Sequence, residues 1–296
     1  MDEITLKALA KINLGLDVVR RREDGYHEVR MIMQTIHLYD LLEIQKIREP
    51  GIQIVSNLSF LPVNENNLVY KAARLLQEEF ALTDGISVKL TKRIPVAAGM
   101  AGGSTDAAAM LYAMNQLYDL GLSRRELMKR GVQIGADVPY CLMRGTALAE
   151  GIGEKLTQLP PMIKCPVLIA KPSISVSTRF VYQNLKLDEQ TNHPDIDALM
   201  KDIREKDFDG VCAHMGNVLE SVTIPNYPVI AEIKQQMMRS GAKASMMSGS
   251  GPTVFGIFDN RDKMAAAARS LRKSGLAKTV FATDIYNRDG GVTNDK

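Results

Sequence analysis

The chain has 296 residues, of which 45% are hydrophobic and 24% are charged. This composition is typical of a globular protein with one large or two modest cores, and it excludes a disordered or low-complexity chain. The 37 basic and 34 acidic residues leave a net charge of only +3, which argues against a dedicated nucleic-acid binder but leaves room for a locally positive cleft.

Cysteine usage and the lack of long apolar runs lead us to expect a cytoplasmic protein. Cys141, Cys165 and Cys212 are far apart and form no CxxC pair, so the sequence predicts neither a zinc site nor a disulfide framework. The sequence does not begin like a signal peptide, and it contains no run of about 18 apolar residues. We therefore also expect no membrane association.

The first half of the chain is predicted to combine strands and helices. From Ile4 to Val18, apolar residues occupy the even positions, which is the period of a strand with one buried face. Lys11 and Asn13 lie at odd positions and point to the opposite side. Further strands are predicted at 29–44, 51–56, 86–94 and around 146–156. Helices are predicted at 67–82, where apolar residues recur at three- and four-residue steps, at the alanine-rich stretch 106–120, and at 123–131, which opens with a capping sequence.

A proline pair divides the second half of the chain from the first. The sequence Leu159-Pro160-Pro161 indicates a domain boundary, so we expect one domain at 1–158 and another at 159–296. The polar stretch 287–296 is expected to be frayed. The mixed order of elements implies an α+β protein rather than a regular βαβ array. Beyond the boundary, the patterns predict strands at 166–170 and 253–258 and helices at 196–205, 227–240 and 264–274.

A turn rich in glycine and small residues at 95–106 is the candidate phosphate-binding element. It lies between a predicted strand and a predicted helix, where glycine N–H groups and the helix N-terminus can converge on an anion. Ser104 and Thr105 add hydroxyl donors. The turn matches neither a Walker A loop nor G-x-G-x-x-G. Judged from this turn alone, a purely structural role, in which the turn packs the helix against the strand, is about as well supported as phosphate binding.

Three segments together resemble the motifs of the GHMP kinases, a superfamily of galactose, homoserine, mevalonate and phosphomevalonate kinases. The turn resembles the second motif, AKINL at 10–14 the first, and SGSGPTVF at 248–255 the glycine-rich third, in the family's order and spacing. The resemblance implies an ATP-dependent kinase with an alcohol acceptor. It also implies an α+β, two-domain fold, with an N-terminal domain like domain 2 of ribosomal protein S5 and an α/β sandwich as the C-terminal domain.

Two further segments narrow the resemblance to one branch of this family. DGYHE at 24–28 and GADVP at 135–139 are similar to kinases that phosphorylate the 2-hydroxyl of a methylerythritol carrying a cytidine diphosphate, in the non-mevalonate route to isoprenoid precursors. The segments 66–68 and 175–182 extend the resemblance. It implies a small-molecule cytidine diphosphate substrate, ATP and Mg²⁺ as cofactors, no nucleic-acid or membrane partner, and a monomer or weak homodimer.

The resemblance assigns catalytic and substrate-binding roles residue by residue. Asp137 matches the base that accepts the proton of the substrate hydroxyl, and Lys11 matches a lysine beside it that keeps it ionised and offsets charge near the acceptor. Taken alone, Asp137 is better explained as a helix cap or turn carboxylate, and the alternative for Lys11 is an ordinary solvated strand lysine; the match over 135–139 reverses the order for Asp137. Asn13 shares a face with Lys11 and could bond the substrate hydroxyls. The residues matching the cytosine site and other substrate-side positions are Tyr26, His27, Thr178 and Tyr182.

The same resemblance supplies the nucleotide site. Asn67 matches a contact near the adenine, and Ser104 is the candidate Mg²⁺ ligand by analogy. Ala97 and Ala101 replace glycines that many relatives carry, and we expect alanine to be accommodated because a tight turn permits it where φ is negative. The candidate ATP-binding residues of the turn are Pro95, Ala97, Gly99, Met100, Ala101, Gly102, Gly103, Ser104 and Thr105.

Three other functions remain open at this point. Another GHMP kinase, acting on mevalonate, homoserine or a sugar, is disfavoured by Tyr26 and His27, because those substrates have no base to stack. A non-catalytic nucleotide-binding relative on the same scaffold is disfavoured by the presence of both Lys11 and Asp137. An RNA-binding module is disfavoured by the balanced charge and the lack of interleaved aromatic and basic residues.

Overall fold

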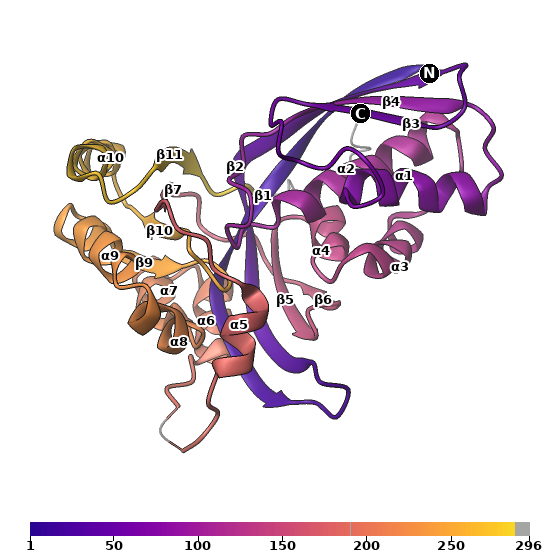
Figure 1. Cartoon of the computed structure of the whole chain (residues 1–296). Helices are drawn as coiled ribbons and strands as arrows, with labels where there is room; N and C mark the ends of the chain where they lie inside the picture. The colour runs from indigo at the N-terminus through magenta and orange to yellow at the C-terminus, as the bar shows by residue number, and fades with distance from the viewer. Residues whose placement is uncertain (190, 288–296) are drawn as a thin grey trace.

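A computed structural model describes residues 1–189 and 191–287 and shows two layered halves, each built of strands and helices (Figure 1). The described residues form a seven-stranded sheet, most of it from the N-terminal half, and a four-stranded sheet in the C-terminal half. The strands are β1 Glu3–Arg21, β2 His27–Ile47, β3 Ile52–Ser56, β4 Gly85–Thr91, β5 Thr146–Gly151, β6 Lys155–Gln158, β7 Pro166–Lys171, β8 Gly216–Asn217, β9 Ala244–Met247, β10 Val254–Ile257 and β11 Thr279–Asp284. The helices are α1 Leu68–Glu79, α2 Gly102–Leu117, α3 Arg124–Ile134, α4 Val138–Met143, α5 Thr178–Asn184, α6 Ile196–Glu205, α7 Phe208–His214, α8 Glu220–Asn226, α9 Val229–Arg239 and α10 Arg261–Ser274.

The longest strands, β1 and β2, form an antiparallel pair that runs from the N-terminal sheet down between the two halves (Figure 1). Their register extends from the pair Glu3 and Gln45 to the pair Arg21 and His27. The even-numbered apolar residues of β1 are buried from Ala8 to Val18, whereas Ile4 and Leu6 are half-buried. The odd positions Leu9, Lys11 and Asn13 are buried as well, so the middle of the strand is covered on both faces and the predicted single buried face was wrong there. Register shifts, which locally re-aim side chains, lie on either side of residues 11–13.

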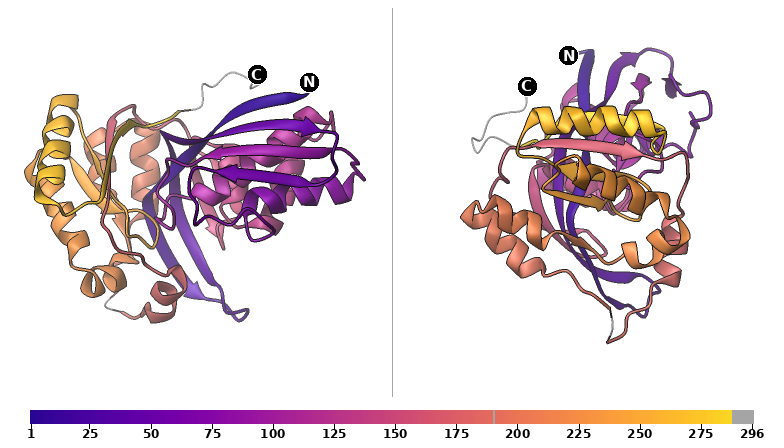
Figure 2. Two further views of the ribbon diagram at one scale, coloured as in Figure 1. Left: turned by 45° about the horizontal axis from the view of Figure 1, so that its top comes forward. Right: turned by 90° about the vertical axis from the view of Figure 1, so that its left-hand side faces the viewer.

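Helices α1 to α4 cover one face of the N-terminal sheet, and α2 lies at their centre (Figures 1 and 2). α2 packs against β1, β2 and the three other helices, so it is buried on nearly every side. Its alanine-rich sequence suits this position, because small side chains let neighbouring elements approach closely. The central position of α2 fixes the turn that precedes it, which is the candidate phosphate-binding element.

The C-terminal sheet has the strand order β11-β7-β10-β9, and its two faces pack against different layers. Leu168 and Ala170 of β7 belong to a cluster that includes buried residues of α9 and α10, which Figure 2 shows on the outer side. Val167 and Ile169 belong to a second cluster with residues of α6, β1 and β2. The alternation of β7 therefore joins the C-terminal helices to the central strand pair.

The two halves share strands. β8 pairs in parallel with β1, and an isolated bridge joins Ile36 to Ile285. The salt bridge between Arg30 of β2 and Asp197 of α6 adds a bidentate contact at the same junction. The division of the chain at residue 158 stays a prediction, but residues from beyond it complete the first sheet.

Most long elements match the sequence predictions, and the differences have physical reasons. The predicted helix at 106–120 begins four residues earlier, because its first turn includes Gly102 and Gly103, which are poor helix formers. α4, α5, α7 and α8 were not predicted, since six or seven residues are too few to show a helical period. Nearly all of the predicted frayed stretch 287–296 lies outside the described residues. Across the described ranges, no helix has the length and apolar character needed to cross a bilayer.

Candidate active site

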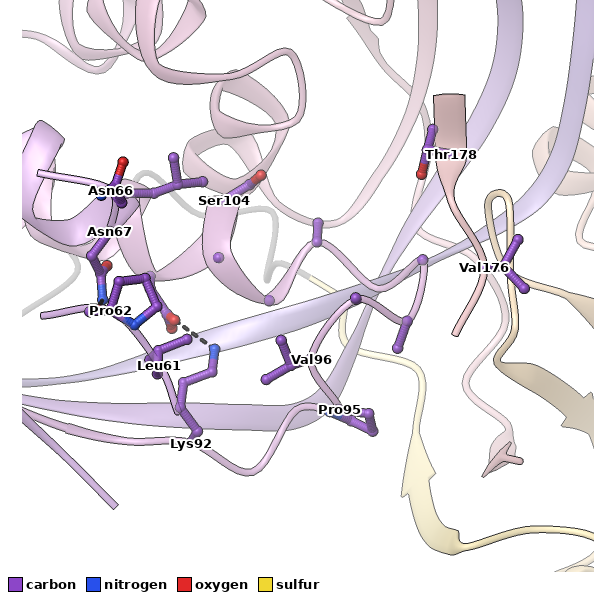
Figure 3. Close-up of a pocket in the computed structure, with 18 of the residues that line it drawn as sticks. Leu61, Pro62, Asn66, Asn67, Lys92, Pro95, Val96, Ser104, Val176 and Thr178 are labelled. Atoms are coloured by element: carbon purple, nitrogen blue, oxygen red, sulfur yellow. Dashed lines mark hydrogen bonds and ion pairs between the residues drawn. The ribbon is translucent and has the colours of Figure 1, made fainter. Parts of the chain in front are cut away.

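A pocket of about 310 Å³ lies where the candidate phosphate turn meets the start of α1 and the C-terminal half (Figure 3). One wall is formed by the loop before α1, with Leu61 and Asn67 labelled in the close-up. Val176 and Thr178, which lie near the start of α5, line the opposite end. The turn itself contributes residues 95–99 and 101–104.

The first turn of α2 faces the pocket with its backbone bare. Gly102, Gly103 and Ser104 line the pocket, and the N-cap residue Ala101 carries only a methyl group, which cannot cap the N–H groups. The early N–H groups of a helix have no intrahelical acceptor, and the helix dipole makes this end positive. The arrangement therefore suits an anionic group such as a phosphate.

The alanines of the turn adopt a conformation different from the one expected. Ala97 and Ala101 have φ values of 49° and 55°, in the left-handed region, whereas the sequence prediction assumed negative φ. This conformation costs a non-glycine residue roughly 1–2 kcal/mol, so the surrounding contacts must hold it in place. The prediction about φ was wrong because the turn requires the left-handed conformation that favours glycine, which alanine adopts here under strain.

The third glycine-rich segment supplies such a contact. The hydroxyl of Ser248 donates to the carbonyl oxygen of Gly99 at 2.9 Å, and Gly99 itself has a φ of +73°. The side-chain amide of Asn217 donates to the carbonyls of Met247 and Gly249, at 2.9 and 2.8 Å. The segment 248–251 is therefore held by β8 and in turn holds the phosphate turn.

The structure brings Lys11 and Asp137 together beside this turn. Lys11 Nζ lies 3.9 Å from Asp137 Oδ2 and donates to Asn13 Oδ1 at 2.8 Å. The Lys11 side chain is buried, whereas that of Asp137 is 32% exposed at the start of α4. The backbone N–H of Lys11 bonds the carbonyl oxygen of Met100 at 3.3 Å, which ties this strand to the turn. An ammonium, a carboxylate and an amide thus meet at one point.

The candidate substrate residues gather around His27. Its ring centroid lies 5.1 Å from that of Tyr182, and Tyr26 is 62% exposed on the hairpin between β1 and β2. Burial lowers the pKa of His27, and the charge of Arg21 adds to that effect. Burial raises the pKa of Tyr182 well above its ordinary value, helped by the charge of Asp137. The rings of His27 and Tyr182 thus form an aromatic site, and the exposed Tyr26 precedes His27 in the chain.

Two contacts show how this aromatic site joins the rest of the pocket. The hydroxyls of Thr178 and Ser250 are 2.8 Å apart, so the start of α5 is fastened to the third glycine-rich segment. Because Tyr182 lies one turn further along α5, the helix carries both pocket-lining and aromatic residues. Helix α5 is therefore the element that links the pocket to the aromatic residues, although Lys11, Asp137, His27 and Tyr182 do not themselves line the pocket.

Three of the predicted nucleotide residues have side chains engaged elsewhere. The Thr105 hydroxyl donates to the carbonyl of Leu9 at 2.8 Å and its N–H to that of Ala101, so the expected phosphate contact is corrected to a bond between α2 and β1. The Met100 side chain is buried in the core. The amide of Asn67 caps α1 at Val69 and donates to Pro62, although the residue still lines the pocket.

The pocket offers few groups for a metal ion. Among the residues described, no cluster of three or more His, Cys, Asp or Glu suits one. Ser104 lines the pocket and has one hydroxyl to offer. This sparse donor set fits Mg²⁺, which keeps several waters and is commonly held through substrate phosphates.

A buried ionic group beneath the turn was missed by the sequence analysis. Lys92 Nζ donates to the carboxylates of Asp40 and Asp106, and all three residues are buried. Lys92, which Figure 3 labels, and Asp106 also line the pocket. A signal was available, because the even-numbered residues Ile86, Val88 and Leu90 of this strand are buried, and Lys92 is the next even-numbered residue. A charged residue at such a position predicts a buried partner of opposite charge.

Two family models match the chain. The one described as "GHMP kinases N terminal domain" matches residues 67–145, and the one described as "GHMP kinases C terminal" matches residues 199–277. The first range includes the phosphate turn and Asp137, and the second includes the third glycine-rich segment. Of the pocket lining, Val176 and Thr178 lie between the two matched ranges, and Gly251 lies within the second.

Curated proteins resemble the chain over nearly its whole length. A protein of Lachnospira eligens named 4-diphosphocytidyl-2-C-methyl-D-erythritol kinase is 59% identical over 286 residues, which cover 97% of this chain and 99% of that protein. A protein of the same name from Acetivibrio thermocellus is 50% identical, with 93% of this chain and 96% of that protein covered.

Solved structures share the architecture. A crystal structure of 4-(cytidine 5'-diphospho)-2C-methyl-D-erythritol kinase has a TM-score of 0.83 and 31% identity, covering 96% of this chain and all of that one. A homoserine kinase from Cytophaga hutchinsonii has a TM-score of 0.77 at 20% identity, with 97% and 94% covered, which shows a common fold alone.

Proposed function

Because this chain belongs to the GHMP kinase family, we propose that it uses ATP to phosphorylate the 2-hydroxyl of 4-diphosphocytidyl-2-C-methyl-D-erythritol, yielding the 2-phosphate and ADP. It is a phosphotransferase that acts on a small molecule. The observation that carries the substrate assignment is the aromatic site of His27 and Tyr182, because Tyr182 lies on α5, the helix whose first residue, Thr178, lines the pocket. The reaction would supply the non-mevalonate route to isoprenoid precursors.

The proposed reaction is an in-line transfer between two oxygens. The oxygen of the 2-hydroxyl attacks the γ-phosphorus of ATP, the bond to the bridging β,γ-oxygen breaks, and ADP leaves. Asp137 accepts the hydroxyl proton. Lys11, 3.9 Å from that carboxylate, offsets negative charge near the acceptor, while Asn13 aligns the hydroxyl.

The two ends of the site bind different ligands. The first turn of α2 receives the phosphates of ATP, with the base directed toward Asn67. When bound through the phosphates and Ser104, Mg²⁺ neutralises charge on the transferring group. At the other end, the cytosine stacks between Tyr26 and Tyr182, and His27 bonds the edge of the base.

Substrate choice is tested by measuring ADP release with three alcohols offered separately. We expect turnover with the cytidyl diphospho-methylerythritol and none with mevalonate or homoserine, because only the first carries a base for the aromatic site. Turnover with mevalonate or homoserine alone would replace the substrate assignment by another GHMP kinase activity. Nucleotide binding with no turnover on any alcohol would favour a non-catalytic relative.

Tyr26→Ala is expected to raise the KM for the cytidyl substrate by roughly tenfold while kcat changes little, because base stacking on an aromatic ring contributes about 1–3 kcal/mol in the ground state. Tyr26 is exposed, so the fold should be unaffected. Tyr70→Ala, at a partly buried position outside the site, serves as a control for the loss of a phenol ring. Steady-state kinetics with saturating ATP measure the effect, and an unaltered KM would remove Tyr26 from the site.

The KM for the cytidyl substrate is expected to stay constant above pH 7 and to rise only at pH values below 6.5. The pKa of His27 is lowered from 6.5 by burial, so its imidazole stays neutral until the pH falls below that value. Protonation would then place a charge against the neutral cytosine edge. His27→Gln should make this acidic limb disappear, and a limb that persists in the variant would assign it to another group.

Three expectations remain proposals. We propose a domain division near residue 158, a cytoplasmic location, and a monomer or weak homodimer. Sedimentation equilibrium across a range of protein concentrations tests the last of these, since a tight dimer would persist at the lowest concentration.

A further inference from the structure

A buried ionic network joins the two ends of the phosphate turn, and we propose that its lysine, Lys92, is a positioning residue that sets the turn for the triphosphate. The network consists of Lys92, Asp40 and Asp106. This proposal rests on the pocket being the nucleotide site, as put forward above. It adds a residue that acts on ATP through the turn.

The network spans three elements that meet under the pocket. Lys92 follows β4, Asp40 belongs to β2, and Asp106 lies in the second turn of α2. Lys92 Nζ donates to Asp40 Oδ2 and, at 2.6 Å, to Asp106 Oδ2. The side chains are at most 3% exposed, so these contacts are shielded from water.

The backbone entering the turn is held by the same network. Asp40 Oδ1 accepts the N–H groups of Arg93 and Ile94, at 2.5 and 2.8 Å, which are the last two residues before Pro95. Asn57 bonds both the N–H and the carbonyl of Lys92. The strand that leads into the turn therefore cannot shift without breaking charge-assisted bonds.

The helix leaving the turn is held at the other end. A methyl group added to Gly102 would lie 3.3 Å from Lys92 Nζ, so the ammonium sits directly beneath the first residue of α2. Asp106 anchors the helix one turn later. Since the N–H groups that face a phosphate belong to this first turn, fixing both ends fixes their direction.

Lys92 and Asp106 line the pocket, yet the charges of the network suit a positioning role better than a direct attraction for ATP. Two carboxylates surround one ammonium, so the group adds no net positive charge to the pocket. The two carboxylates raise the pKa of Lys92 even though burial opposes this, which keeps the ammonium charged. Burial raises the pKa of Asp106 well above its ordinary value, and the charge of Asp40 adds to this.

The proposal is tested by calorimetric titration with an ATP analogue in the absence of any alcohol, together with steady-state kinetics. We expect Lys92→Met to raise the Kd and KM for nucleotide by about tenfold, equivalent to about 1.4 kcal/mol, with the KM for the cytidyl substrate changed less than about twofold. Lys89→Met, on the same strand and in an exposed ion pair with Glu43, is the matched control and should behave as wild type.

A second variant separates position from stability. Lys92→Met leaves two buried carboxylates without their cation, which destabilises the fold. Lys92→Met with Asp106→Asn removes one of these charges, so we expect it to recover stability while nucleotide binding stays weak. If Lys92→Met does not fold, Asp106→Ala carries the test, because it releases α2 and keeps the pair of Lys92 and Asp40.

The outcomes are distinguishable from those of the proposed function. Wild-type nucleotide binding in folded Lys92→Met, or in Asp106→Ala, would overturn the positioning role while leaving the kinase assignment intact. Equal weakening of nucleotide and cytidyl substrate would also overturn it, because that pattern reports general loss of structure. A protein that binds nucleotide but phosphorylates none of the alcohols would end the substrate assignment and leave this inference standing.

Discussion

Asp137→Asn is expected to lower kcat by roughly 10²–10⁴-fold, the range of general-base contributions, while the protein still folds and binds ATP. The amide has nearly the shape of the carboxylate but cannot accept the proton of the attacking hydroxyl. Since the Asp137 side chain is partly exposed, the substitution leaves no buried charge unpaired except that of Lys11, which keeps its bond to Asn13. The loss should therefore appear in kcat and hardly in the KM for either substrate.

The measurement is steady-state kinetics with both substrates saturating, together with circular dichroism and ATP titration of the variant. Asp119→Asn, at the far end of α2, is a suitable control for an aspartate-to-asparagine change outside the pocket. A kcat like that of the wild type in Asp137→Asn would exclude this residue as the base. Loss of ATP binding as well would indicate a structural role instead.

Gly99→Ala is expected to lower the free energy of unfolding by about 3 kcal/mol or more, through backbone strain and overpacking together, and to weaken ATP binding. The residue has a φ of +73°, and a Cβ would lie 2.1 Å from the carbonyl oxygen of Ser248. The two glycine-rich segments would have to separate. The phosphate turn would then lose the support that Ser248 provides.

Gly121→Ala provides a matched comparison, because Gly121 has a φ of +68° but nothing within 4 Å of an added Cβ. It should lose only the strain contribution of about 1–2 kcal/mol and bind ATP normally. Urea unfolding of the two variants, with ATP titration, separates the effects. If both lose the same stability and both keep ATP affinity, the contact between the glycine-rich segments has no role in the pocket.

The sequence predicted long elements well because their periodicity reflects burial. The predicted helix 196–205 matches α6, and β1 extends only slightly beyond the alternation that predicted it. β8, with two residues, and the short helices have no pattern of their own. They form where tertiary contacts, such as the pairing of β8 with β1, supply the stability that local sequence lacks.

The candidate site was found through motifs rather than through periodicity. The sequence placed Lys11 and Asp137 in one site only by resemblance, since they are 126 positions apart in the numbering; the structure shows them 3.9 Å apart. The φ values of Ala97 and Ala101 were not predictable, because alanine normally avoids that region. The network of Lys92 was not predicted, although Lys92 continues the buried positions of its strand and so gave a usable signal.

The bond from Ser248 to Gly99 has a consequence for cooperativity. Residues from the N-terminal and C-terminal halves must be docked before the nucleotide pocket has its final shape, so a ligand bound there stabilises the docked arrangement as a whole. Saturating ATP should thus raise the melting temperature of the whole protein. If the chain were cut between the two halves, it would bind nucleotide only after both fragments had reassembled. Nucleotide binding would therefore report whether the fragments had reassembled.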